Sequence, residues 1–511
     1  MRGLLIRDCQ IGNDSSSSVY CQEGVIVRVS RGSELPAKPD DVVIEANGGS
    51  LFPGFIDTHC HPFEYGWLKR NVDLRGTSNI TGLRLRLQAG INRARPGDWV
   101  SGMGWDQEAF SDGRMPSRTD IDDISPSNPV ALSRICGHVA VLNTNALDVL
   151  GFSARMGPEY ERDVRGNLTG IVKEQVLKEV FSKIPRTMDT SAADLQSIEA
   201  EAGRFGLTSL HCILSPEGFR EELAALSGLN AAQSLSLRYR VYVPPEALES
   251  LVGPIDRTKP DSGKVRVKGV KIYADGSLGA GTAALREPYT DDPSNSGILR
   301  HKTEALADLV EKIDEQGFQV IIHAIGDRAV EQAVDALSPV TGSRNERRHR
   351  IEHASLLPKD LRSKMAKHNL RATVQPLFIT SDTWAANRLG EERVRDLYPL
   401  NSMLNDGIVA SGSSDSPVES MSPILGVWAA MTRGGSTPTE SITLNQAFSL
   451  YTTNAASNGF DDSAGKISEG AAATFTVLDS NVTEMHPALL RKVGILATVV
   501  EGSVVHSYDN P

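Results

Sequence analysis

The sequence predicts an α/β protein: a (β/α)8 TIM barrel with a β-sandwich domain formed by both termini and a long insertion after the first barrel strand. Two observations carry this prediction. The middle of the chain alternates apolar, strand-like runs with helical stretches, and both ends consist of short apolar runs with a period near two. The domain boundaries that follow are 1–50 plus 460–511 for the sandwich and 51–459 for the barrel.

The N-terminal part of the predicted sandwich contains the runs GLLIRDCQI, VYCQEGVIVRVS and DVVIEA. The polar stretch Asp14–Ser18 is expected to be a hairpin tip between them. The C-terminal part contains ATFTVLD, GILATVVEG and SVVHSY. Two unrelated β appendages are the alternative to a single domain.

The barrel is predicted from eight apolar runs with helix-like segments between several of them. One such helix is expected over 303–317, where Gly317 is a stop signal. Active sites of (β/α)8 barrels lie at the C-terminal ends of the strands. The eight runs are, in order, LFPGFIDTH, LTSLHC, LRYRVYV, VKGVKIY, FQVIIHA, HRIEHA, RATVQP and GIVASG.

The first two of these runs are separated by residues 63–205, a stretch far too long for a loop. We expect an inserted lid subdomain here that covers the barrel mouth and sets specificity.

The composition is that of an ordinary folded protein, with 40% hydrophobic and 23% charged residues. A formal net charge of −11 argues against a nucleic-acid groove or an anionic membrane as partner. The five cysteines are widely spaced with no CxxC pair, which favours a reducing compartment. With neither a signal sequence nor a membrane span in the chain, we expect a cytoplasmic protein that acts on a small molecule.

The strongest local signal is PGFIDTHCHP, residues 53–62. His59 and His61 are two apart, so on a strand both side chains point to the same face and can chelate one metal ion. Imidazole ligands suit zinc, iron, nickel or manganese. Cys60, between them, would point away and is interpreted as a packing residue.

Three further candidates follow later strands: His323, His353 and Asp415. A single histidine after an apolar strand is more often a hydrogen-bonded core residue. Several such residues at the predicted C-terminal strand ends are less easily explained in that way, because a barrel would bring them together at its mouth. Asp415 has an alternative role as the N-cap of a helix that starts at Ser414–Pro417.

Lys271 lies within the apolar run VKGVKIY, where a bare ammonium group is costly to bury. Its side chain would snorkel, face solvent or pair with Asp275. A fourth interpretation is chemical: a desolvated lysine reacts with carbon dioxide to give a carbamate that bridges two metals.

The motifs together resemble the amidohydrolase superfamily, and within it the YtcJ-like branch (the amidohydrolase-3 type). They occur in family order across nearly the whole chain, which makes the resemblance specific for the branch but not for a substrate. The motifs are LFPGFIDTHCHP, SPSNPVALSRICGHVAVLNTNAL, GNLTGIVKE, GVKIYADGSLGAGTAAL, GFQVIIHAIGDRAV, RHRIEHASLL, VQP, GSSDSPV and GKISEGAAATFTVLD … VVEGSVVH.

The resemblance implies two divalent metal ions, with zinc favoured over iron, manganese or nickel. His59 and His61 would bind the buried ion, and His323 and His353 the second. Carboxylated Lys271 would bridge them, and Asp415 would contact the buried ion and transfer protons. The substrate pocket would be lined by Trp105, Asp106, His138, Glu174 and the DGSLG loop from Asp275.

The chain departs from the family pattern at three positions. Gly281 stands where an arginine is frequent, and Cys212 where the second strand usually ends in aspartate. Thr474 stands where the C-terminal motif commonly has an acidic residue. None concerns a proposed metal ligand, and the first two bear on substrate choice.

The implied reaction is hydrolysis of an amide, N-formyl or N-acyl C–N bond by a metal-activated hydroxide. An ester or lactone hydrolase and a catalytically inactive scaffold are the alternatives. A homodimer is an expectation by analogy.

Overall fold

The computed structural model describes residues 3–33, 35–135, 139–157, 159–173, 175–184, 188–248, 263–342, 344–461 and 463–508. The chain divides into two compact units. Unit 1 consists of residues 1–62 and 195–511, and unit 2 of residues 63–194. The expected insertion ran from 63 to 205. Each unit is described by itself below.

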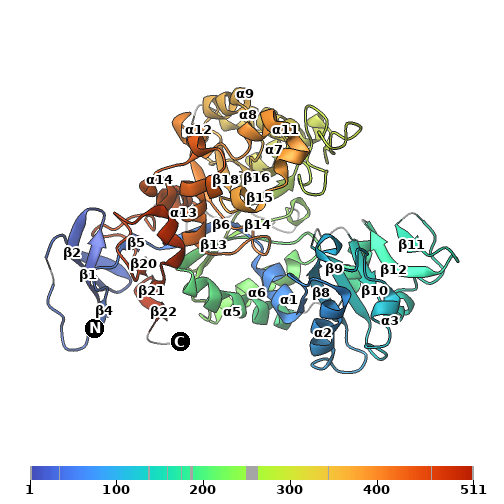
Figure 1. Cartoon of the computed structure of the whole chain (residues 1–511). Helices are drawn as coiled ribbons and strands as arrows, with labels where there is room; N and C mark the ends of the chain where they lie inside the picture. Colours follow the sequence, from blue (N-terminus) through green and yellow to red (C-terminus); the bar gives the residue numbers. More distant parts are fainter. Residues whose placement is uncertain are drawn as a thin grey trace. The chain divides into compact units, whose positions relative to one another are not determined.

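Unit 1 is built around one sheet of eight parallel strands (Figure 1). The first and last barrel strands are also in contact with each other. The hydroxyl of Thr58 on the first strand donates to the carbonyl oxygen of Gly412 on the last strand at 2.9 Å. All eight predicted barrel strands are confirmed. In spatial order they are β6 (Phe55–Cys60), β13 (Leu207–Ile213), β14 (Arg238–Val243), β15 (Val265–Tyr273), β16 (Gln319–Ala324), β17 (Arg350–His353), β18 (Arg371–Val374) and β19 (Ala410–Gly412).

The first predicted run, LFPGFIDTH, is in fact two strands. Leu51–Pro53 forms β5, which pairs with a C-terminal strand, and β6 begins only at Phe55. Gly54 separates them, and a Cβ at this position would lie 2.4 Å from the side chain of Thr208 on the neighbouring strand. Every residue of β6 is buried, as expected for a parallel strand covered on both faces.

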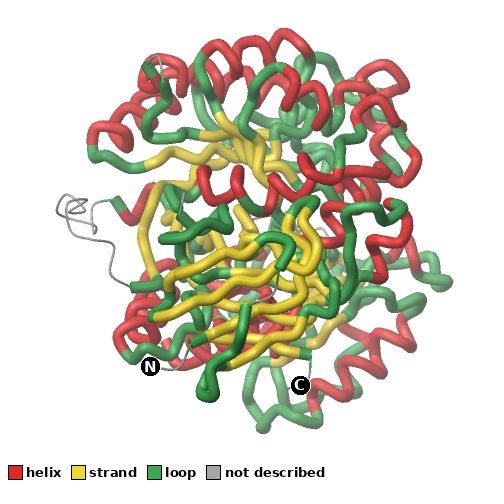
Figure 2. Tube along the Cα trace, turned by 90° about the vertical axis from the view of Figure 1, so that its left-hand side faces the viewer, coloured by secondary structure: helices red, strands yellow, loops and turns green. Residues whose placement is uncertain are grey.

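Helices surround the barrel strands (Figure 2). The expected helix over 303–317 is present as α7 (Thr303–Glu315), where Leu306, Val310 and Ile313 form the buried stripe. The other helices of this unit are α6 (Phe219–Ala231), α8 (Asp327–Thr341), α9 (Lys359–Lys367), α10 (Phe378–Ser381), α11 (Ala385–Arg393), α12 (Leu400–Asn405), α13 (Pro423–Thr432), α14 (Leu444–Tyr451) and α15 (Thr453–Asn458).

Both termini contribute one four-stranded sheet to a β-sandwich, as predicted (Figure 1). The buried residues of the two sheets form one hydrophobic core that includes Ile6, Val19, Phe475 and Val499. The sheets consist of β1 (Leu4–Ile11), β2 (Asp14–Gln22), β3 (Val25–Ser30) and β4 (Val42–Glu45), and of β5, β20 (Phe475–Leu478), β21 (Ile495–Val500) and β22 (Ser503–Ser507).

The hairpin tip expected at Asp14–Ser18 was wrong. These residues lie within β2, and the turn is made by Gly12 and Asn13. Gly12 has a φ of +59°, a conformation that glycine adopts without steric cost.

Unit 2 has a sheet of its own, with six strands. Its helix α2 begins after Asn79, whose side chain accepts the N–H of Gly82. Its elements are α1 (Pro62–Arg70), β7 (Val72–Asp73), α2 (Ile80–Ile91), β8 (Val100–Trp105), β9 (Val130–Arg134), β10 (Val139–Leu142), α3 (Thr144–Val149), β11 (Tyr160–Arg162), β12 (Leu168–Lys173) and α4 (Gln175–Lys183), and α5 (Met188–Arg204) runs on into unit 1.

Among the described residues, no helix combines the length and the apolar character that a membrane crossing requires.

Candidate metal centre

The predicted ligands lie at one end of the barrel of unit 1. His59 belongs to the end of β6, and His353 is the last residue of β17. Lys271 and His323 lie near the C-terminal ends of β15 and β16, and Asp415 follows β19 by three residues. Neighbouring parallel strands end at the same edge, which brings residues far apart in sequence to one place.

His59, His61 and Asp415 form the tightest cluster. Oδ1 of Asp415 lies 3.2 Å from Nε2 of His59 and 3.4 Å from Nε2 of His61. The three ligand atoms are all within 4.8 Å of one another. Two imidazole nitrogens and a carboxylate oxygen at this spacing fit a single divalent cation such as zinc.

Two backbone hydrogen bonds hold Asp415 against the histidine strand. The N–H of Asp415 donates to the carbonyl of His59 at 2.9 Å, and the N–H of His61 donates to the carbonyl of Ser416 at 2.8 Å. Asp415 itself has a φ of +54°, so it turns sharply out of the strand direction. This turn places its side chain beside both histidines.

The alternative role of Asp415 as a helix cap is not supported. The next helix, α13, begins at Pro423, and its N-cap is Ser422, whose hydroxyl accepts the N–H of Leu425. Residues 415–418 form a turn instead. Asp415 is therefore placed by the histidine strand and not by a helix.

Glu352, which the sequence analysis missed, supports His59 from the other side. Its Oε2 contacts Nδ1 of His59, and its Oε1 accepts a 2.5 Å hydrogen bond from Arg350. Burial alone would raise the pKa of Glu352, but Arg350 and His59 bring it well below its usual range. The ionised carboxylate holds the Nδ1 proton of His59, which leaves Nε2 as the ligand atom.

Lys271 is fully buried, so it neither snorkels nor faces solvent. Its Nζ lies 3.2 Å from Nε2 of His59. Burial lowers the pKa of Lys271 to about 8, against the opposing charges of Glu352 and Asp415. With this pKa about one tenth of the amine is neutral at pH 7, far more than for an exposed lysine.

Lys271 and Asp275 form no ion pair, and the Asp275 side chain is buried. The Asp275 carboxylate accepts the N–H groups of Ala284, Ile325 and Gly326 at 2.9 to 3.1 Å, and it has no exposed surface. Burial raises its pKa to about 7. Through these hydrogen bonds Asp275 connects the loop after β15 with the loop after β16.

His323 and His353 face each other with ring centroids 4.4 Å apart. Nε2 of His323 is 3.0 Å from the carbonyl oxygen of Gly276, and Nδ1 of His353 is 2.8 Å from Oε1 of Gln375. These acceptors hold the ring protons, so Nδ1 of His323 and Nε2 of His353 remain for a cation. Burial lowers the pKa of His353 to about 3 and that of His323 well below its usual value, which keeps both rings neutral.

The four pocket residues expected in the insertion have different outcomes. Trp105 has no exposed surface, and its indole N–H donates to the carbonyl of Leu132 within the core of unit 2. Trp105 is thus a packing residue and not part of a pocket wall. Asp106 accepts a 2.8 Å hydrogen bond from Arg134. His138 and Glu174 lie outside the described residues.

Two aromatic residues near the ligands were also missed. The Tyr273 ring centroid is 5.3 Å from that of His323, and Phe378 is nearly parallel to His353 at 6.4 Å. Tyr273 ends the same strand as Lys271, so its place two residues further along was the available signal. Phe378 carried none, because it belongs to a short helix beyond β18. Cys60 is buried, and its thiol contacts the carbonyl of His211, as a packing role requires.

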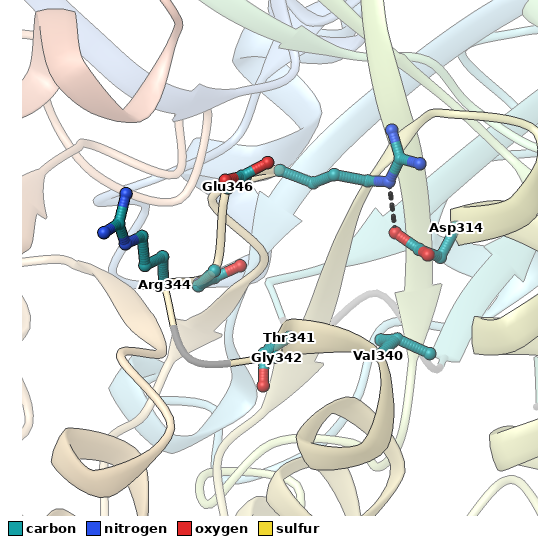
Figure 3. A pocket seen from close by; sticks show the side chains of 8 residues that line it. Asp314, Val340, Thr341, Gly342, Arg344 and Glu346 are labelled. Carbon is teal, nitrogen blue, oxygen red and sulfur yellow. Dashed lines mark ion pairs between the residues drawn. The ribbon is translucent and has the colours of Figure 1, made fainter.

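A separate cavity of about 700 Å³ is lined by Asp314 of α7, the end of α8 and the segment that follows it (Figure 3). That segment leads into the first residue of β17, so the cavity lies at the end of the barrel opposite the predicted ligands. It contains the ion pair between Asp314 and Arg347, and the Arg344 side chain points away from that pair. Acidic and basic side chains both line it. It is distinct from the histidine cluster.

Comparison with known proteins agrees with this geometry. The chain is 31% identical to the Bacillus subtilis (strain 168) protein YtcJ, which carries an amidohydrolase name, over 96% of each chain. It is 26% identical to an N-substituted formamide deformylase of Arthrobacter pascens, over 98% of each. An uncharacterised metal-dependent hydrolase of Pyrococcus horikoshii OT3 superposes with a TM-score of 0.80 at 30% identity, covering 95% of this chain and 99% of the other.

The family comparison covers the barrel, the insertion and the sandwich strands from β4 onward. The model of the amidohydrolase family matches residues 42–506, which include every ligand of the centre described above. The chain therefore belongs to the amidohydrolase family.

Proposed function

We propose that the protein is a metal-dependent amidohydrolase that hydrolyses an amide, N-formyl or N-acyl C–N bond of a small molecule. The observation that carries the proposal is the cluster of His59, His61 and Asp415, whose ligand atoms lie within 4.8 Å of one another at the mouth of the barrel. The family has hydrolytic members, and metal-binding side chains lie together at the barrel mouth. Both observations favour a hydrolase over a catalytically inactive scaffold.

The metal-holding residues divide into two groups. His59, His61 and Asp415 would hold one divalent cation. His323 and His353 would hold a second, with Lys271 as a carbamate between the two groups. Zinc suits this nitrogen-rich donor set, and iron, manganese or nickel are alternatives. Bound divalent cations supply Lewis acidity, which makes water nucleophilic at neutral pH and polarises a carbonyl oxygen.

The protein itself supplies proton transfer and orientation. Asp415 takes up a proton from the attacking water on its carboxylate and delivers it to the leaving nitrogen. Burial opposes ionisation of Asp415, but the neighbouring His59 keeps its pKa well below the usual range, so it is ionised before the reaction. Glu352 and Gln375 fix the ring orientations of His59 and His353.

Support for a C–N bond comes from the relatives. The Arthrobacter pascens protein is named for removal of a formyl group from N-substituted formamides, and the alignment with it covers nearly the whole of both chains. Esters and lactones need the same nucleophile and the same polarised carbonyl, so they form the competing substrate class.

A panel of N-formyl, N-acyl, cyclic-amide and ester compounds tests the proposal. The purified protein is stripped with a chelator, reloaded with zinc, manganese, iron or nickel, and assayed for release of amine or carboxylate. We expect hydrolysis of at least one amide class, lost with the chelator and restored by the metal. His61→Ala should abolish it and lower the metal content. Turnover of esters alone, or none with any metal, would contradict the proposal.

A further inference from the structure

Among the arginines on the loop after β15 and on α11, Arg300 differs from Arg286, Arg388 and Arg393 in its contacts. Arg286 pairs with Glu331 and Asp360. Arg388 and Arg393 are likewise bound to acceptors on the loop after β15, as described below. The guanidinium of Arg300 forms no hydrogen bond or ion pair with any residue that the structure describes, and its side chain is exposed.

The acceptors of Arg388 and Arg393 lie on the loop after β15, apart from the carbonyl of Leu389 in α11, which also accepts from Arg393. Arg388 binds the carboxylate of Asp291 at 2.9 Å and the carbonyl of Gly279 at 3.1 Å. Arg393 donates to the carbonyls of Glu287 and Pro288, both at 2.8 Å. These arginines fasten loops, whereas Arg300 has its donors available.

The position of Arg300 is fixed by its backbone. Its N–H donates to the carbonyl of Ala274 at 2.8 Å, directly after the end of β15. The carbon of its guanidinium lies 5.7 Å from the centroid of the Tyr273 ring. A cation over an aromatic face is held there by the negative charge density of the ring.

Tyr273 connects this guanidinium to the metal centre. The same ring lies 4.8 Å from Nζ of Lys271 and 5.3 Å from the ring of His323. The half-buried ring of Tyr273 therefore lies close both to Arg300 and to two of the proposed metal-holding residues. A substrate whose scissile carbonyl lies at the centre would extend past Tyr273 towards Arg300.

We propose that Arg300 is a specificity residue that binds a carboxylate of the substrate, so that the preferred substrates are amides or N-formyl compounds with a carboxylate group. A guanidinium presents planar, paired N–H donors that match a carboxylate, and it holds its charge at every physiological pH. The apolar part of such a substrate would pack on the Tyr273 ring. This inference rests on the proposed function, because it concerns the same site.

Two N-formyl substrates of equal length test it, one ending in a carboxylate and the other in a hydroxyl group. The readout is the ratio of their kcat/KM values. We expect a ratio above one for the wild-type protein. Arg300→Gln should lower it about 10- to 100-fold, mainly through KM, because a hydrogen bond to a charged group is lost in ground and transition state alike. Arg300→Lys, which keeps the charge but not the planar donors, should give an intermediate ratio.

Arg344→Gln is the matched control. It removes the same charge from an exposed arginine at the opposite end of the barrel (Figure 3) and should keep the wild-type ratio. An unchanged ratio in Arg300→Gln, or an equal fall in Arg344→Gln, would overturn the inference while the hydrolase proposal stands.

Hydrolysis of neither compound would count against the proposed function instead. Calorimetric binding of the carboxylate compound to the zinc-loaded protein then tests Arg300 directly. Weaker binding to Arg300→Gln than to Arg344→Gln supports the inference, and equal binding overturns it.

Discussion

Glu352 on β17 is in contact with Nδ1 of His59 on β6, across the interior of the barrel. The pair ties the histidine strand to the strand that ends in His353. Arg350 completes it by donating to Glu352 and, at 3.0 Å, to the carbonyl of Thr58 next to His59. A buried carboxylate behind a histidine ligand fixes the ring and raises its basicity.

Glu352→Gln should therefore weaken metal binding about 10- to 100-fold. The amide keeps the shape of the side chain but not its charge, and it leaves Arg350 as an uncompensated buried cation, so the melting temperature should also fall. Glu222→Gln is the control, since Glu222 is buried and accepts the N–H and hydroxyl of Ser215 away from the histidines. Competition with a chelator measures the affinities. Equal zinc affinity in both variants would leave Glu352 with only a packing role.

Asp415→Asn tests proton transfer. The amide can still contact the two histidines but cannot take up a proton, so turnover should fall about 100- to 10,000-fold. We expect metal still largely bound and nearly normal melting. Asp382→Asn, which alters an aspartate hydrogen-bonded to Tyr398 on the mouth loops, should lose much less activity. Near-native turnover of Asp415→Asn in a saturating assay would remove Asp415 from the chemistry.

Much of this centre was predictable because barrel strands end at one edge. His323 and His353 each end an apolar run. Because such a residue recurs on several strands, it identifies the C-terminal end of the barrel without knowledge of the loops. Glu352 was not found, although it is adjacent to His353. An acidic residue in an apolar strand signals function only when its buried partner is known, and His59 lies 293 positions away in the sequence.

Other errors arose where tertiary contacts override local pattern. The run LFPGFIDTH reads as one strand, but its first residues pair with the C-terminal sheet, and Gly54, where a Cβ would clash with Thr208, separates them from β6. Trp105 lies in a motif that suggests a pocket, yet its ring fills the core of unit 2. Sequence identifies a large aromatic side chain but does not indicate which surface it packs against.

Lys271→Ala tests the carbamate. We expect loss of the second metal, because the bridging oxygens disappear, and a large loss of turnover. Short carboxylic acids such as acetate or propionate should restore part of the activity, since they fit the vacated space and supply oxygens. In the wild-type protein, labelling with ¹³C-bicarbonate should give a carbamate signal in the NMR spectrum. Absence of that signal from fully metal-loaded protein, together with unchanged metal content in the variant, would rule out the bridge.

The last prediction concerns His349, at the opposite end of the barrel from the metal centre. Its Nδ1 accepts the N–H of Val320 at 2.9 Å, and its Nε2 lies 3.1 Å from Oδ1 of Asp314. Burial lowers the pKa of His349 to about 4, although Asp314 acts in the opposite direction. The folded protein therefore keeps this ring neutral at pH values where the unfolded chain, with a pKa near 6.5, takes up a proton.

Because the unfolded state then binds more protons, stability should fall as the pH is lowered from 6.5 towards 4. At pH 5 the loss from this single group amounts to about 2 kcal/mol relative to pH 7. His349→Gln removes the titration and should be less stable at pH 7, where its hydrogen bonds are weakened. Denaturant unfolding of both proteins from pH 8 to pH 5 measures the difference between them. That difference should stay constant between pH 8 and pH 7.5 and shrink by about 2 kcal/mol by pH 5, whereas two parallel stability curves over the whole range would show that His349 does not carry this pH dependence.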